Sequence, residues 1–152
     1  MVQPEPMNDS QQFFASFVMD IPDDWFDVTE SLAEGTPPTL GREQGPGALQ
    51  FSLARFKGGV EPEFDENKLL AMIREFVATN DLGDALSEAS GAVIGEMSHA
   101  TGTYVSGIDL TAVWYLSNGR DVMLVTYCAD DALLEAAAEL AQVREIVRSI
   151  RL

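Results

Sequence analysis

The chain has 152 residues, of which 46% are apolar, so it is long enough for one domain with a hydrophobic core and short for two. Its formal net charge of −16 disfavours direct binding to nucleic acids or anionic membranes, because both are negatively charged. No run of about eighteen apolar residues is present, and the start lacks the basic and apolar segments of a secretion signal. We therefore expect a cytoplasmic protein without a membrane-spanning helix.

The first third of the chain predicts a tail followed by short strands. Residues 1–11 are rich in proline and polar residues, so we expect a disordered tail and a single domain over residues 12–152. Alternating apolar residues predict a strand from Phe13 to Ile21. After a turn at Pro22, residues 25–30 predict a short returning strand.

Residues 35–47 are rich in glycine and proline and predict the longest loop of the domain. Loops of this length are often functional, so this one is a candidate contact surface. Its glycines do not predict a phosphate-binding loop, because a strand over residues 48–56 follows them rather than a helix.

Two helices are predicted. Asp65 is a good N-cap for the first, and Gly83 is the expected C-terminal breaker. The first apolar stripe consists of Leu69, Met72, Ile73, Phe76 and Val77. The second helix follows Asp130 and Asp131, with an apolar stripe of Leu133, Ala137, Leu140, either Val143 or Val147, and Ile150. Its polar face should carry Glu135, Glu139, Gln142, Glu145 and Arg148.

The strongest hairpin signal is Asn118-Gly119, which predicts a two-residue type I′ turn with positive φ at both positions. The cross-strand pairs expected from that turn are Ser117–Arg120, Trp114–Met123, Val113–Leu124 and Leu110–Tyr127. Both faces are apolar near the turn, so we expect the hairpin to be covered on both sides. Upstream, two strands should meet near Thr101-Gly102, and Ser106-Gly107 should turn into the hairpin.

Few residues suggest chemistry. Cys128 is the only cysteine, and its place in a strand predicts a small buried core residue. His99 is the only histidine, and we expect it at a strand end, solvent-exposed or hydrogen-bonded. No P-loop, CxxC pair, nucleophile elbow or HExxH pattern is present. We therefore expect no catalytic, cofactor-binding or metal-binding residues and no enzymatic activity.

The predicted order is three strands, a helix, four strands from about Ala89 to Ala129, and a long terminal helix. This order, with Ile21-Pro-Asp-Asp-Trp25 and Ala48-Leu-Gln-Phe-Ser52, resembles the PsbP-like superfamily. That superfamily includes the extrinsic subunit of photosystem II, a Ran-binding nuclear-transport factor and many bacterial domains. The resemblance implies an α+β fold, a three-layer α/β/α sandwich with a central antiparallel sheet of about six or seven strands and a long C-terminal helix.

The resemblance also implies a non-enzymatic protein-binding module of bacterial type, such as an accessory chaperone or adaptor for another protein. Residues 1–41 hold eight acidic residues and no Lys or Arg, which suits a basic partner but also a simple solvated face. The alternatives are an acidic immunity-type inhibitor of a basic toxin, and a small-molecule binder or enzyme. The last would have a pocket beneath the loop, lined by Trp25, Trp114 or Tyr104. The candidate partner-binding residues are Asp23, Asp24, Trp25, Phe26, Glu34, Arg42 and Glu43.

Overall fold

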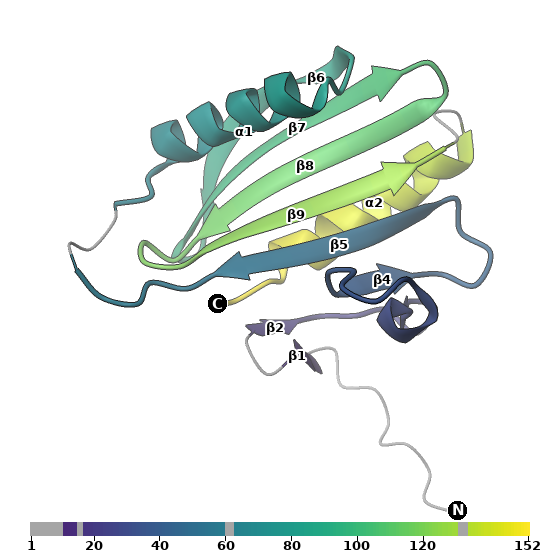
Figure 1. The fold of residues 1–152 in the computed structure, drawn as a ribbon, viewed down its shortest axis with the longest axis horizontal. Helices are drawn as coiled ribbons and strands as arrows, with labels where there is room; N and C mark the ends of the chain where they lie inside the picture. Colours follow the sequence, from purple (N-terminus) through teal and green to yellow (C-terminus); the bar gives the residue numbers. More distant parts are fainter. Residues whose placement is uncertain (1–10, 15–16, 60–62, 131–133) are drawn as a thin grey trace, which may run out of the picture.

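A computed structural model describes residues 11–14, 17–59, 63–130 and 134–152 (Figure 1). Within them lie a seven-stranded antiparallel sheet of order β3-β4-β5-β9-β8-β7-β6, a two-stranded sheet of β1 and β2, and two α-helices. The strands are β1 (Gln11–Phe14), β2 (Phe17–Met19), β3 (Phe26–Asp27), β4 (Thr39–Gly41), β5 (Gly47–Ala54), β6 (Asp84–Ile94), β7 (Met97–Ser106), β8 (Asp109–Ser117) and β9 (Val122–Ala129). The helices are α1 (Glu66–Asn80) and α2 (Leu134–Arg148), with a 3₁₀ turn at Thr29–Ser31.

The α+β class and the predicted antiparallel sheet are confirmed, with seven strands in the main sheet. The especially long terminal helix is not confirmed, because α2 has 15 residues, the same number as α1. Most of the predicted tail, residues 1–10, lies outside the described residues, as do Asp131 and Leu133 at the predicted start of the terminal helix.

Helix α1 begins as predicted. The Asp65 side chain accepts a hydrogen bond from the backbone N–H of Lys68 at 2.8 Å, and the chain leaves the helix through Asp81 in the left-handed conformation. The helix contacts β6, β7 and β8. Its buried Leu69 and Ile73 pack in a cluster with Ala100, Tyr104 and Val113 from the sheet.

Helix α2 lies against β5 and β9, the strands that Figure 1 shows in front of it. Its side chains contribute to a larger core cluster. Its buried apolar residues are Ala136, Leu140, Val143, Ile146 and Val147, with Ile150 just beyond the helix. Two predictions for this helix are wrong, because Ala137 is exposed and Glu139, expected on the polar face, is buried. On β8, Trp114 belongs to this cluster whereas the adjacent Val113 belongs to the α1 cluster.

The central hairpin has a different register from the predicted one. Ser117 pairs with Val122 rather than Arg120, and Trp114 pairs with Val125 rather than Met123. Residues 118–121 form the loop, in which Asn118 Oδ1 accepts from two backbone N–H groups and Ser117 Oγ donates to the Asp121 carbonyl. These side-chain bonds stabilise a wider turn than type I′. The shift is two residues, so every side chain stays on its predicted face.

The turn between β6 and β7 lies at Gly95-Glu96, not at Thr101-Gly102 as predicted. Gly102 instead lies inside β7, opposite Val113 of β8. A Cβ atom on Gly102 would collide with the ring of Tyr104, which lies two residues along the same face. The glycine therefore makes room for an aromatic side chain and does not break the strand.

The N-terminal strands are shorter than predicted. Instead of one strand over residues 13–21, β1 pairs with β2, and Phe17, Met19 and Ile21 are buried in the predicted alternation. The strand expected over residues 25–30 is reduced to the two residues of β3. The predicted loop over residues 35–47 contains a further strand, β4, which pairs with both β3 and β5.

Candidate functional site

The candidate site is a hollow of about 350 Å³ at one edge of the sheet, between β3 and the β4–β5 connection. We call it the loop hollow, and its lining residues are Asp24, Phe26, Arg42, Glu43, Gln44 and Gly45. Phe26 pairs with Gly41 across β3 and β4, which brings residues 24–26 next to residues 42–45. Four of the predicted partner-binding residues therefore come together: Asp24, Phe26, Arg42 and Glu43.

The other three predicted residues do not line the hollow. Asp23 and Glu34 are exposed elsewhere on the surface. Trp25 is only 2% exposed, and its Nε1–H donates to Gln142 Oε1 of α2 at 3.3 Å. The prediction of Trp25 as a contact residue is wrong, because Trp25 alternates inward between the outward-facing Asp24 and Phe26 and anchors this edge to the core.

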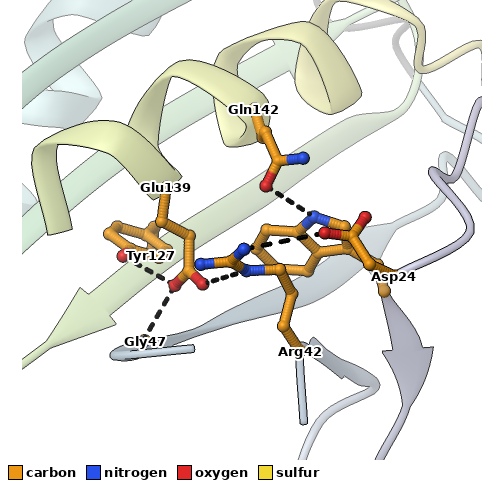
Figure 2. A network of polar contacts seen from close by, with 7 residues as sticks. Asp24, Arg42, Gly47, Tyr127, Glu139 and Gln142 are labelled. Atoms are coloured by element: carbon orange, nitrogen blue, oxygen red, sulfur yellow. Dashed lines mark hydrogen bonds and ion pairs between the residues drawn. The ribbon is translucent and has the colours of Figure 1, made fainter. Parts of the chain in front are cut away.

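Next to the loop hollow lies Glu139, which binds Arg42 (Figure 2) and has a fully buried side chain. Its carboxylate accepts three hydrogen bonds, from Arg42 Nε at 2.6 Å, Tyr127 Oη at 2.8 Å and the Gly47 backbone N–H at 3.0 Å. A buried carboxylate requires such partners, because burial without them is costly. Glu139 thus fixes the β4–β5 connection against α2 and the sheet.

Arg42 connects the buried Glu139 to the surface. Its guanidinium also lies 3.6 Å from the Asp24 carboxylate, which is half exposed. The pKa of Arg42 is raised, first by the hydrogen bond to Glu139 and to a smaller extent by Asp24. The positive charge of Arg42 is therefore already neutralised by two acids, and the surface around the hollow presents carboxylates and the half-exposed ring of Phe26.

The helical spacing of α2 contained a signal for Glu139 that the sequence prediction missed. Glu139 lies three residues after Ala136 and four before Val143, both of which are buried. Residues at those spacings share one helix face, so Glu139 falls on the apolar stripe. A lone acid on an apolar stripe indicates a buried, hydrogen-bonded carboxylate.

The aromatic pocket expected beneath the 35–47 loop is not present among the described residues. Trp25 and Trp114 are both buried in the larger core cluster, whereas Tyr104 is buried in the α1 cluster. Trp114 does line a cavity of about 200 Å³, but with residues of β6, β7 and α2 rather than of the loop. The loop hollow is lined by Phe26 instead.

Cys128 and His99 also differ from prediction. Cys128 is exposed rather than buried, because it lies near the end of β9 whereas α1 covers β6, β7 and β8. It lines a wide groove of about 500 Å³ with Ala48 and Thr111. His99 lies within β7 and is 4% exposed, and its Nε2 has no hydrogen-bond partner in the described structure. The expected exposed or hydrogen-bonded role is therefore wrong for this nitrogen.

Among the described residues, no group of three or more His, Cys, Asp or Glu side chains could hold a metal ion. The helices in this part of the chain are too short or too polar to cross a membrane.

No model of a known protein family matches the chain. No curated protein matches it either. Among solved structures, a crystal structure of a protein from Bacteroides thetaiotaomicron VPI-5482 is similar, with a TM-score of 0.50 and 17% sequence identity. The similarity covers 89% of this chain and 44% of that one, so this chain spans less than half the length of that protein. At this identity the likeness concerns the fold alone.

Proposed function

We propose that the protein is a non-enzymatic binding module for another protein, an accessory chaperone or adaptor, and that the loop hollow is its contact surface. The observation that carries the proposal is Phe26, a large apolar side chain that is 51% exposed and flanked by Asp24 and Glu43. Exposed aromatic residues in a concave surface are typical anchors of protein interfaces.

The chemistry of the loop hollow favours a basic partner segment. A Lys or Arg side chain can lay its apolar stem or its charge against the Phe26 ring while carboxylates pair with the charged end. The net charge of −16 would accelerate the encounter with such a partner. The buried Glu139 holds the surrounding loop in place, so less conformational entropy is lost on binding.

The test compares proteins retained from a host extract at low salt by the wild type and by Phe26→Ala and Glu43→Gln variants. We expect at least one retained protein with a basic surface, and about tenfold weaker retention by Phe26→Ala, the loss typical of an interface anchor. Leu86→Ala is a matched control, because Leu86 is 63% exposed on β6 at the opposite edge of the sheet. Retention that is unaffected by both site variants would contradict the proposal.

The acidity also supports a second candidate, an immunity-type inhibitor that covers the basic surface of a toxin. An isolated partner separates the two functions. An inhibitor should abolish the enzymatic activity of its partner at equimolar concentration, whereas a chaperone or adaptor should leave that activity intact. The Glu43→Gln variant should weaken inhibition in the first case.

We also propose that the chain has the three-layer α/β/α arrangement of the PsbP-like superfamily and works in the cytoplasm. The layered arrangement is supported by β8, where Val113 packs with α1 and Trp114 packs with α2. An experimental structure that placed both helices on one face of the sheet would contradict it. Cell fractionation of the native host tests the location.

A further inference from the structure

A second cavity lies toward the β6 edge of the sheet, opposite the β3 edge that carries the loop hollow. Its volume is about 200 Å³. The wall is built by residues 90–92 and 94 of β6, by His99 and Thr101 of β7, by Trp114 of β8 and by one face of α2. No residue of the 35–47 loop or of the loop hollow is part of this wall.

The polar end of this cavity is His99. Its side chain is buried, and its Nε2 atom has no hydrogen-bond partner within the described part of the chain. Buried polar atoms in folded proteins are almost always hydrogen-bonded to protein or to a bound molecule. An unpartnered imidazole nitrogen in the wall of a cavity therefore points to an occupant that makes this bond.

The charged end of the cavity comes from α2. Arg144 and Arg148 both line it, because residues four apart lie on the same helix face. The Arg148 guanidinium lies 3.8 Å from the Glu145 carboxylate, and both side chains are exposed, so this ion pair holds Arg148 weakly. Burial, and after it the nearby charges of Arg151 and Arg148, lower the pKa of His99 to about 4. His99 is thus neutral at pH 7. The chain has only nine Lys and Arg residues, and two of them, Arg144 and Arg148, place their positive charge at this cavity.

We propose that this cavity binds a small hydroxycarboxylate, with its carboxylate between Arg144 and Arg148 and its hydroxyl on His99 Nε2. Two guanidinium groups favour a carboxylate. A hydroxyl both donates and accepts, so it satisfies Nε2 in either neutral tautomer. Trp114 and Val147 provide apolar wall for a short carbon chain. The volume is below the ~300 Å³ at which sites for drug-sized ligands begin, so the ligand must be small.

Lactate is a suitable probe, and His99 is a clean reporter because it is the only histidine. The ring ¹⁵N signals of His99 are followed by NMR during titration with lactate, lactamide and propionate. We expect saturable shifts with millimolar lactate. Lactamide lacks the charge and propionate lacks the hydroxyl, so each should bind about tenfold more weakly, the loss expected for one charge-assisted hydrogen bond.

The variants Arg144→Gln and Arg148→Gln should each weaken lactate binding about tenfold for the same reason. Arg74→Gln is the matched control, because Arg74 is exposed on α1 and should leave binding unchanged. Absence of any His99 shift with lactate would overturn the proposal and indicate that solvent alone occupies the cavity. Equal affinities for lactate and lactamide, or equal effects of all three arginine variants, would overturn it as well.

Discussion

At the scale of single residues, Glu139 has the widest influence on the structure. Its buried carboxylate joins three segments that are far apart in the sequence: the β4–β5 connection through Arg42 and Gly47, β9 through Tyr127, and α2 itself (Figure 2). Gly45 is part of the same arrangement, because a Cβ atom there would collide with the Glu139 carboxylate. The candidate binding surface therefore depends on an acid that it does not expose.

Replacing Glu139 by Gln should destabilise the protein by about 2–4 kcal/mol, because Arg42 loses its buried partner and one acceptor becomes a donor. Urea unfolding at pH 7 measures this change. Glu145→Gln is the control on the same helix, since the Glu145 side chain is 77% exposed and its ion pair should contribute less than about 0.5 kcal/mol. Similar losses for both variants would contradict the role assigned to Glu139.

His99 should make stability fall as the pH is lowered from 6.5 to 4. The unfolded chain binds a proton at His99 near pH 6.5, whereas the folded chain does so only near pH 4, so acid favours unfolding between these values. The resulting loss of unfolding free energy is close to zero above pH 7 and should reach about 2 kcal/mol at pH 5.

The His99→Asn variant removes this titration and leaves every carboxylate in place. The difference in unfolding free energy between wild type and variant should therefore change by about 2 kcal/mol between pH 7 and pH 5. A difference that is the same at both pH values would show that folding does not lower the pKa of His99.

Loop composition and acidic character pointed to Asp24, Phe26, Arg42 and Glu43 as candidate contact residues, and these four are among the six that line the loop hollow. These local signals could not predict the contacts that hold the four residues in place. Arg42 and Glu139 are 97 residues apart in the sequence, and no local pattern specifies such a contact. Local patterns do not predict the cavity beside His99 either, because residues from four separate elements form its wall.

At the scale of elements, local signals predicted which segments are helices and strands better than how they pair. The cap at Asp65, the stripe of α1 and the alternation of β5 all have local causes, and all are present. The hairpin register depended on side-chain bonds from Ser117 and Asn118 that the Asn-Gly pattern does not encode. Gly102 was misread as a turn because only the fold places the Tyr104 ring over it.

The N-cap of α1 gives a prediction at this scale. Asp65→Ala should lower the unfolding free energy by about 1 kcal/mol, because the backbone N–H of Lys68 loses its acceptor at an exposed helix end. Asp65→Ser should retain most of the stability, since a hydroxyl oxygen can accept the same bond. Thermal unfolding followed by circular dichroism measures both. Equal losses for Ala and Ser would indicate that the charge, rather than the hydrogen bond, stabilises the helix.

At the scale of the whole molecule, the net charge of −16 is a destabilising term that salt should reduce. Raising sodium chloride from about 0.01 M to about 0.1 M shortens the screening length from about 30 Å to about 10 Å. We expect the Tm to rise over this range. Chloride is preferable to sulfate, which strengthens apolar burial independently of charge. A Tm that stays constant or falls would show that the ion pairs, such as Arg42 with Glu139, outweigh the general repulsion.

The backbone bridge between Val18 and Arg151 has a consequence for the order in which the molecule comes apart. Each residue donates to the other, at 3.1 and 2.8 Å, and the neighbouring contact between Asp20 and Ser149 joins positions 129 residues apart. Contacts across so long a loop form late in folding, because most of the chain must be ordered before they meet. We expect amide hydrogens at Val18 and Arg151 to exchange with solvent well before those of β8, through local openings that leave the sheet intact.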